Sequence, residues 1–375
     1  MKARCRNLLV LAGVVVAALS WAWGCDTNSK HMFFPSIMDT EISPDGQRVA
    51  CGFLPSTGGV RMAIVELSSG DATLITGPRG DYDRPIQWSN TNNELLFARC
   101  TATSRTSVSR LMTLTMPEAI PTALRTPNGL QIGNARWLGA TGDIVAMVEG
   151  GNGQDAGICR LERSGSAWRM AEPIVANEAG GEWAGLWVTT TKTGYRIVAK
   201  EEQRRNDDIT TRLWTREGLA GRRKLLGEFG KCFGADLSSN GDRFAVIEPS
   251  DAERDFERKL HLLDTRATSQ AEAGTVRLEA DFVSWSPDGS RLLAWKHGRF
   301  LGPLTSEPGN LVLVYPGGLV IKEVPGGPWS PTSCAWLPDG KRIVIGAEHA
   351  LWIVDVETGL RREVWRIPPR YKRQD

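Results

Sequence analysis

Histidines are the residues best suited to hold a transition metal, and the chain has four of them. His31 lies in a predicted linker, while His261 and His349 flank predicted strands. His297 therefore stands alone in a predicted loop, two residues before Arg299. A single histidine does not make a transition-metal site without carboxylate ligands. We expect no metal and no other cofactor, and we keep His297 and Arg299 as candidates for ligand contact.

The sequence lacks the motifs of the enzymes that combine a propeller with hydrolytic catalysis. Propeller peptidases of the prolyl-oligopeptidase kind carry the nucleophile in a Gly-x-Ser-x-Gly turn of a separate hydrolase domain. The chain has no such motif and, on our division of it, no space for that domain. Sialidase-like propellers repeat a Ser-x-Asp-x-Gly-x-Thr-Trp box, whereas Asp288 and Gly289 are adjacent here. These absences favour binding over catalysis.

Binding residues are expected where an aromatic side chain stands beside glycines or charges between the repeating units described below. One such segment is Arg79-Gly80-Asp81-Tyr82-Asp83-Arg84, and another is Gly326-Gly327-Pro328-Trp329. Trp183 falls outside the regular spacing of the tryptophans and is the third candidate. With the two loop residues above, the candidate binding residues are Arg79, Asp81, Tyr82, Asp83, Arg84, Trp183, His297, Arg299 and Trp329.

A repeat supplies the elements that would position these residues. Residues 283–295 predict an apolar strand, a tight Pro-Asp-Gly turn and a second apolar strand. The pattern recurs at seven anchor positions separated by 47 to 52 residues, namely Gly46, Asn93, Gly142, Gly194, Gly241, Gly289 and Gly340. Strand-rich repeats of this length are typical of propeller blades. We predict an all-β fold, a β-propeller of seven four-stranded blades; because the fourth unit is weak, six and eight blades are the alternatives.

The repeat resembles the TolB-type, WD-like β-propeller repeat. The match is carried by Pro85-Ile86-Gln87-Trp88-Ser89, by Trp285-Ser286-Pro287-Asp288-Gly289 and by Asp355-Val356-Glu357-Thr358-Gly359, and it covers roughly residues 35–367. The resemblance implies a propeller fold but no particular activity, because propellers carry many unrelated functions. Oligogalacturonate-lyase-like propellers, which are close to this repeat, depend on a histidine-rich metal site that four scattered histidines do not supply.

Tryptophan and arginine recur in register with the anchors. Trp88, Trp137, Trp187, Trp285 and Trp336 all end a predicted inner strand, so we expect them to fill the gap between adjacent sheets rather than to stack on a ligand. An arginine follows the anchor by two positions in five units, at Arg48, Arg196, Arg243, Arg291 and Arg342. We expect these guanidinium groups to reach turn carbonyls or an aspartate of the next blade.

The first 25 residues have the features of an export signal: basic residues, the apolar stretch 8–19 and small residues before Cys25. Gly24-Cys25 followed by polar residues is typical of a bacterial lipoprotein, in which Cys25 would be lipidated; cleavage to a soluble exported protein and an uncleaved anchor are the alternatives. We divide the chain into a signal peptide at 1–25, a polar linker at 26–34, a propeller at 35–367 and a basic tail at 368–375. The propeller is expected outside the cytoplasm, in the periplasm or at the cell surface, as a monomer.

The charges and cysteines exclude two further classes. The net charge is +2, from 45 basic and 43 acidic residues, so no basic surface for nucleic acid is predicted. No Cys-x-x-C spacing suggests a redox or metal site. An oxidising compartment permits a disulfide, for which Cys51 and Cys100 are the best pair, but a cysteine on a strand is more often a small buried apolar residue.

Function in a propeller is expected where the units differ, because insertions gather on one face. The connections between second and third strands are long at 101–109, 150–157, 200–210, 249–259 and 296–310. They share a face with the segments that link the blades. We expect a protein- or peptide-binding scaffold of the cell envelope that uses this face; the alternative is an enzyme or receptor for a saccharide or other small polar ligand at the mouth of the central channel.

Overall fold

A computed structural model describes most of the chain after the leader. The described residues are 36–54, 60–77, 82–90, 93–100, 109–124, 131–139, 142–149, 157–164, 167–176, 181–192, 194–205, 208–249, 258–267, 272–278, 280–296, 300–302, 305–306, 309–327, 329, 331–347 and 349–368. The predicted signal peptide, Cys25, the linker and the tail after residue 368 lie outside these ranges. No helix in the described ranges is long and apolar enough to cross a membrane.

Seven four-stranded antiparallel sheets, here blades 1 to 7, follow one another along the described chain. Blade 1 holds β1 (Ser36–Ile42), β2 (Arg48–Leu54), β3 (Val60–Glu66) and β4 (Ala72–Thr76). Blade 2 holds β5 (Tyr82–Trp88), β6 (Glu94–Cys100), β7 (Ser109–Thr115) and β8 (Ile120–Ala123). Blade 3 holds β9 (Gln131–Leu138), β10 (Asp143–Glu149), β11 (Gly157–Ser164) and β12 (Ala167–Ala176). Blade 4 holds β13 (Gly181–Thr191), β14 (Gly194–Arg205), β15 (Asp208–Glu217) and β16 (Lys224–Phe229).

The last three blades follow the same plan. Blade 5 holds β17 (Ala235–Leu237), β18 (Arg243–Pro249), β19 (Arg258–Asp264) and β20 (Glu272–Leu278). Blade 6 holds β21 (Phe282–Trp285), β22 (Leu292–Lys296), β25 (Asn310–Tyr315) and β26 (Val320–Glu323), with the small hairpin β23 (Phe300–Gly302) and β24 (Thr305–Ser306) between its second and third strands. Blade 7 holds β27 (Ser333–Trp336), β28 (Arg342–Ala347), β29 (Ala350–Asp355) and β30 (Arg361–Arg366).

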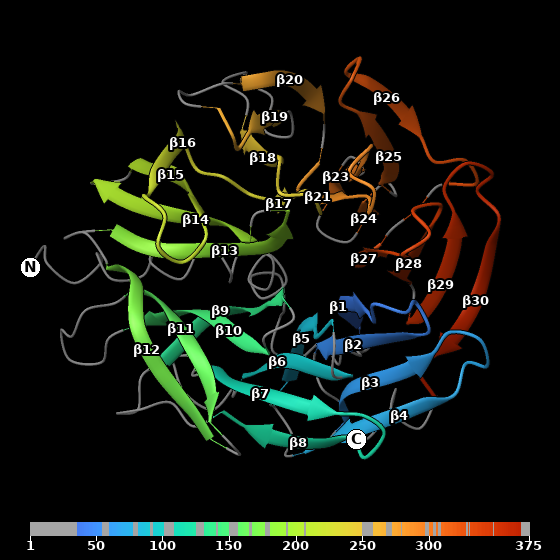
Figure 1. Cartoon of the computed structure of the whole chain (residues 1–375). Coiled ribbons are helices and arrows are strands. Elements are labelled where there is room, and N and C mark those ends of the chain that lie inside the picture. Colours follow the sequence, from blue (N-terminus) through green and yellow to red (C-terminus); the bar gives the residue numbers. More distant parts are fainter. Residues whose placement is uncertain are drawn as a thin grey trace, which may run out of the picture.

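The seven sheets close into a ring around one axis (Figure 1). The first strand of each blade is innermost, and each contacts the inner strands of the two neighbouring blades, so that β27 returns to β1. Seven clusters of buried apolar residues lie in the described part, and each is shared by two adjacent blades. The predicted seven-bladed propeller is therefore confirmed, and its core lies between the blades.

The anchor positions adopt the positive φ that was expected of them as turn residues. All seven have positive φ, from 50° at Asn93 to 136° at Gly194. A short polar network fixes the preceding turn, because Ser286 Oγ donates to Asp288 Oδ1 at 2.5 Å and accepts the Arg291 N–H at 3.2 Å. The turns after β1 and β17 carry the same network, with asparagine in place of aspartate after β17. The Ser-x-Asp-Gly repeat is thus a turn-forming device.

Tryptophan and arginine side chains tie each blade to its neighbour. The indole Nε1 of Trp88 donates to the Glu41 carbonyl oxygen of the preceding blade at 3.1 Å, and Trp336 makes the equivalent bond to Ser284 at 3.2 Å. Arg196 and Arg291 donate to turn carbonyls of the following blade. These contacts confirm the predicted structural roles, although Arg48 and Arg342 pair within their own blades.

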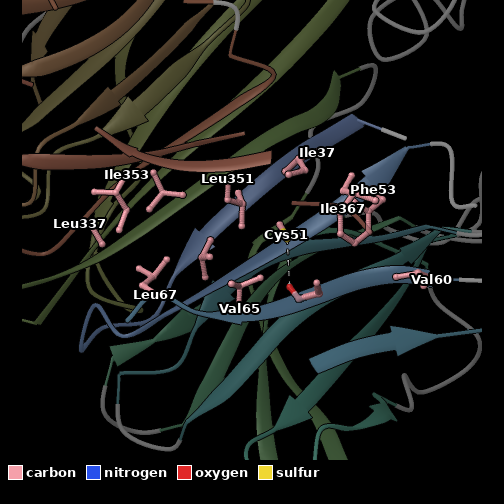
Figure 2. Packing of buried hydrophobic residues seen from close by; sticks show 13 residues of the cluster. Ile37, Cys51, Phe53, Val60, Val65, Leu67, Leu337, Leu351, Ile353 and Ile367 are labelled. Carbon is pink, nitrogen blue, oxygen red and sulfur yellow. Dashed lines mark hydrogen bonds between the residues drawn. The ribbon is translucent and has the colours of Figure 1, made fainter. Parts of the chain in front are cut away.

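The ring closes without exchange of a strand, because blades 1 and 7 are each built from one continuous stretch of chain. Their junction is an apolar cluster that includes Ile37, Val65, Leu351 and Ile367 (Figure 2). Thr332 Oγ1 donates to the carbonyl oxygen of Ile37 across the junction. Packing and hydrogen bonds therefore hold blades 1 and 7 together, whereas a shared strand joins the first and last blades of some other propellers.

Two of the connections predicted to be long, 200–210 and 296–310, contain strands, and the second holds β23 and β24. Residues 200–205 and 208–210 continue β14 and β15 as a paired hairpin, in which Arg205 lies opposite Asp208. The prediction of a long connection there was wrong, because a segment with charges of both signs can form a cross-strand pair as well as a loop. Cys51 is a free, buried thiol whose Sγ lies 3.6 Å from the Ala63 carbonyl oxygen, so the proposed pairing with Cys100 does not form. Burial raises the pKa of the Cys51 thiol to about 12.

Candidate functional site

Charged side chains from four inner strands converge on the axis of the ring. They are Asp39 and Glu41 on β1, Arg84 on β5, Arg136 on β9 and Asp236 on β17, and we call them the axial cluster. Arg136 lies close enough to Glu41, Arg84 and Asp236 to interact with each of them electrostatically. Asp39 interacts in the same way with Arg84. Because these strands belong to blades 1, 2, 3 and 5, the cluster spans the axis rather than one junction.

Strand alternation, together with the innermost position of these strands, explains why these residues lie at the axis. Successive side chains of a strand point to opposite faces. Ala135 and Trp137 of β9 are buried in the core shared by blades 2 and 3, which directs Arg136 between them to the other side. Leu237 of β17 is likewise buried against blade 4, next to Asp236.

Two members of the axial cluster are held in place by hydrogen bonds. Asp236 accepts the backbone N–H of Leu237 at Oδ1 and that of Trp285, in the next blade, at Oδ2, at 2.9 and 2.7 Å. Arg136 donates from Nη1 to Asn134 Oδ1 at 2.8 Å and to the Ala135 carbonyl oxygen at 2.9 Å. The guanidinium of Arg136 is therefore oriented through one nitrogen.

The other three members have no such restraint. Within the described part of the chain, the side chains of Asp39, Glu41 and Arg84 make no hydrogen bond or ion pair. All three keep part of their surface accessible although protein surrounds them, as expected of groups that line the axis. Two carboxyl groups and one guanidinium are thus available to a ligand.

Removal from bulk water dominates the electrostatics of the axial cluster. It raises the pKa of Glu41 to about 8, against the opposing charge of Arg136 and with a further contribution from Asp39 and Asp236. It also raises the pKa of Asp39, against Arg84, and raises that of Asp236 to about 6. Burial lowers the pKa of Arg136. Glu41 is mostly protonated at neutral pH, so two guanidinium groups there face at most two ionised carboxylates.

Of the predicted binding residues, Arg84 joins the axial cluster. Asp83, its neighbour, is fully buried and binds the Arg99 guanidinium through both oxygens at 2.9 and 2.8 Å, with Arg61 of blade 1 at 3.8 Å. Tyr82 packs against the core between blades 2 and 3. Asp83 and Tyr82 therefore have structural contacts that join blades.

The two predicted tryptophans are core residues. Trp329 is 2% exposed and packs between blades 6 and 7. Trp183 is 9% exposed and lies between blades 3 and 4, with the Arg223 guanidinium 5.8 Å from its ring centre. Arg79, Asp81, His297 and Arg299 lie outside the described residues.

Four members of the axial cluster, Asp39, Glu41, Arg136 and Asp236, were not predicted from the sequence. A signal for most of them existed in the repeat. The residue just before the last core position of the inner strand is polar in five units, at Glu41, Gln87, Arg136, Asp236 and Ser284, although its strand neighbours are mostly apolar. This polar position in a buried strand marks the axis.

Comparisons with known proteins establish the fold. No family model matches the sequence, and no curated protein matches it. Among solved structures, a manganese complex of oligogalacturonate lyase is similar at a TM-score of 0.59 and 13% identity, covering 81% of this chain and 83% of that one. The oligogalacturonate lyase of Vibrio parahaemolyticus gives 0.58 and 10%, covering 90% and 92%. The propeller domain of the trilobed protease from Pyrococcus furiosus, described as having an open velcro topology, gives 0.56 and 14%, covering 88% and 98%.

Identities this low show a shared β-propeller architecture and nothing finer. In the portion of the chain that the structure covers, no group of three or more histidine, cysteine, aspartate or glutamate side chains is arranged to hold a metal ion. The axial cluster is therefore considered on the chemistry of its own five side chains.

Proposed function

We propose that the protein is a binding propeller that holds a small polar ligand at the axial cluster. The observation that carries this proposal is the convergence of Asp39, Glu41 and Arg84 on the axis, where they interact with neighbouring charges but make no hydrogen bond or close ion pair in the described chain. Charged groups removed from bulk water are normally paired. A ligand with hydrogen-bond donors and acceptors would supply the missing partners.

The alternation of charge favours recognition of a polar molecule over an apolar one. Donors on Arg84 and Arg136 and acceptors on Asp39 and Asp236 face the same space. Asp236 and Arg136 are fixed by backbone and side-chain hydrogen bonds, so part of the cluster is organised before a ligand arrives. Preorganisation reduces the entropy lost on binding.

Thermal-shift and calorimetric screens of the mature protein test this proposal. The panel should contain neutral, anionic, cationic and zwitterionic small molecules. Binding that is lost in Asp39→Asn and Arg84→Gln but kept in Arg342→Gln, an exposed arginine paired within the turn of blade 7, is expected. No binding by any class, or binding that Asp39→Asn and Arg84→Gln both leave intact, would refute a ligand site on the axis.

A second candidate function is docking of a protein or peptide on the loop-rich face. Phe233 lies in the segment between β16 and β17 and is 38% exposed. It is on the face of the propeller that also carries the connection from β18 to β19. Lys231 Nζ and Arg258 Cζ lie 5.5 and 4.5 Å from its ring centre. An exposed aromatic ring close to two cations can serve as an interface anchor.

Affinity capture from the protein's own cell envelope tests the docking proposal. Partner capture should be lost in Phe233→Ala and retained in Leu360→Ala. Leu360 is an exposed apolar residue in the turn between β29 and β30, on the opposite face of the propeller. Equal capture by both variants would contradict docking through Phe233.

We also propose that the protein acts outside the cytoplasm and is lipidated at Cys25, on the strength of the leader sequence. Metabolic labelling with a fatty acid should mark the wild-type chain and leave Cys25→Ser unmarked. A processed but unlabelled wild-type chain would indicate a soluble exported protein instead.

A further inference from the structure

Two guanidinium groups lie close enough at the axis to repel each other. Arg84 on β5 and Arg136 on β9 come from neighbouring blades and interact with like charge. In the described chain no carboxylate is within ion-pair distance of either group, although Glu41 and Asp236 interact with Arg136, and Asp39 with Arg84, over a longer range. Other arginines in blades 1 to 3 that lie at blade junctions have close partners, such as Arg163 with Glu94 at 2.7 Å.

The geometry of Arg136 leaves its remaining donors available. Only Nη1 of Arg136 is used within the described chain, by Asn134 and Ala135. The guanidinium presents five N–H donors in a planar fork that matches the two oxygens of a carboxylate. Nε and Nη2 of Arg136 are therefore free to bind such a group.

The carboxyl groups of the axial cluster do not compete strongly for these donors. Asp236 is committed to the backbone N–H groups of Leu237 and Trp285. Glu41 is in large part protonated at neutral pH and can donate a hydrogen bond. Asp39 lies on the Arg84 side and is left to accept from the ligand.

We propose that the axial ligand carries a carboxylate and that Arg84 and Arg136 together bind it. This inference rests on the proposed function, because it names the class of ligand for the same site. A carboxylate between two guanidinium groups removes their repulsion and forms charge-assisted hydrogen bonds, which are the strongest available to these side chains.

Three probes of matched length test the inference by isothermal titration calorimetry. Succinate is the anion, succinamide its neutral counterpart and 1,4-diaminobutane the cation. Succinate should bind at least about tenfold more tightly than either of the other two, which corresponds to about 1.4 kcal/mol. Inorganic phosphate is the control for anions in general and should bind more weakly than succinate.

Variants assign the binding to the two arginines. Arg84→Gln should weaken succinate at least about tenfold, and Arg84→Lys should recover only part of the loss because an ammonium group does not form the bidentate pair. Arg84 makes no hydrogen bond in the described chain, so its substitution should leave folding intact; circular dichroism verifies this. Arg136→Gln should act in the same direction.

The outcomes separate this inference from the proposed function. Succinate binding that depends on both arginines supports it. Tighter binding of succinamide or 1,4-diaminobutane, binding of phosphate equal to that of succinate, or succinate binding unchanged in Arg84→Gln overturns it while leaving a polar-ligand site in place. Absence of binding by all the matched probes also overturns it, and the wider screen described above then decides whether any axial ligand exists.

Discussion

Trp137 and Gln87 join blades 2 and 3 through two hydrogen bonds. The indole Nε1 of Trp137 donates to the Gln87 carbonyl oxygen at 3.2 Å, and the backbone N–H of Trp137 donates to Gln87 Oε1 at 2.8 Å. One residue pair thus fixes both the position of a large core side chain and the spacing of two inner strands. Trp285 and Asp236 repeat the second of these bonds between blades 5 and 6.

Removing the indole N–H of Trp137 should lower the stability of the propeller by the free energy that its hydrogen bond contributes. Trp137→Phe is expected to lower the free energy of unfolding by about 1 kcal/mol beyond the loss of packing, because a buried carbonyl loses its donor. Trp285→Phe is the matched control, since its buried Nε1 has no hydrogen-bond partner among the described residues. Urea unfolding of both variants measures the difference; an equal cost in the two would show that the indole bond contributes nothing.

Asp83 should be among the most sensitive polar positions of the protein. Asp83→Asn removes the buried carboxylate that pairs with Arg99 and with the buried Arg61, and we expect a loss of about 3–5 kcal/mol in the free energy of unfolding. Asp45→Asn is the control, because Asn240 already makes the same turn contacts in blade 5. Thermal unfolding should show a large drop in Tm for the first variant and a small one for the second. A small drop for both would contradict a structural role for Asp83.

Glu41 should make stability depend on pH. Its pKa rises from the ordinary 4.5 to about 8 on folding, so the folded chain binds the proton more tightly than the unfolded chain. Stability therefore falls as the pH rises from about 4.5 to about 8, and the loss is complete above that range.

Glu41→Gln removes this loss. The variant should gain roughly 2–4 kcal/mol over the wild type at the alkaline end, less than the full shift implies because the side chain keeps part of its surface accessible, and should gain little at the acidic end. Urea unfolding at both ends of the range measures the gain, with Glu323→Gln on the exposed strand β26 as control. A gain that does not change with pH would contradict the assignment.

Gly346 should be intolerant of a side chain at the junction of blades 1 and 7. A Cβ atom there would lie 2.8 Å from Ile37 Cγ2 and 2.6 Å from Ser333 Oγ. Gly346→Ala is expected to cost about 1–3 kcal/mol through overpacking. Gly317→Ala, where the space is open, should be neutral in the same thermal unfolding assay. Unchanged stability in Gly346→Ala would show that the junction adjusts freely.

Much of the fold could be predicted because the same turn, which requires a residue with positive φ, occurs in all seven units of the repeat. Gly289 and its equivalents need a positive φ, and even the asparagine at position 93 adopts it. The tryptophans of the inner strands were predicted to be core residues for the same reason, and Trp88 and Trp336 are. Repetition in register indicates structure.

The axial cluster could not be predicted in the same way, because it depends on residues that differ between blades. Asp39, Arg84 and Arg136 are far apart in sequence and come close to one another only when blades 1 to 3 pack around the axis. Trp329 shows the same limit: an aromatic residue beside glycines between two units suggested ligand contact, yet its side chain packs between blades 6 and 7. The local sequence indicates on which face of its strand a side chain lies. The packing of the blades around the axis determines which other side chains it contacts.

Every blade of this ring is a single uninterrupted segment of chain. Duplicating or deleting one such segment in the gene would add or remove a whole sheet with its own hydrogen-bond ladder intact. Joining the two ends across the junction at Ile37 and Ile367 and opening the chain between any other two blades would likewise leave all seven sheets uncut. The architecture is therefore open to circular permutation and to changes in blade number, which rings that share a strand between first and last blades resist.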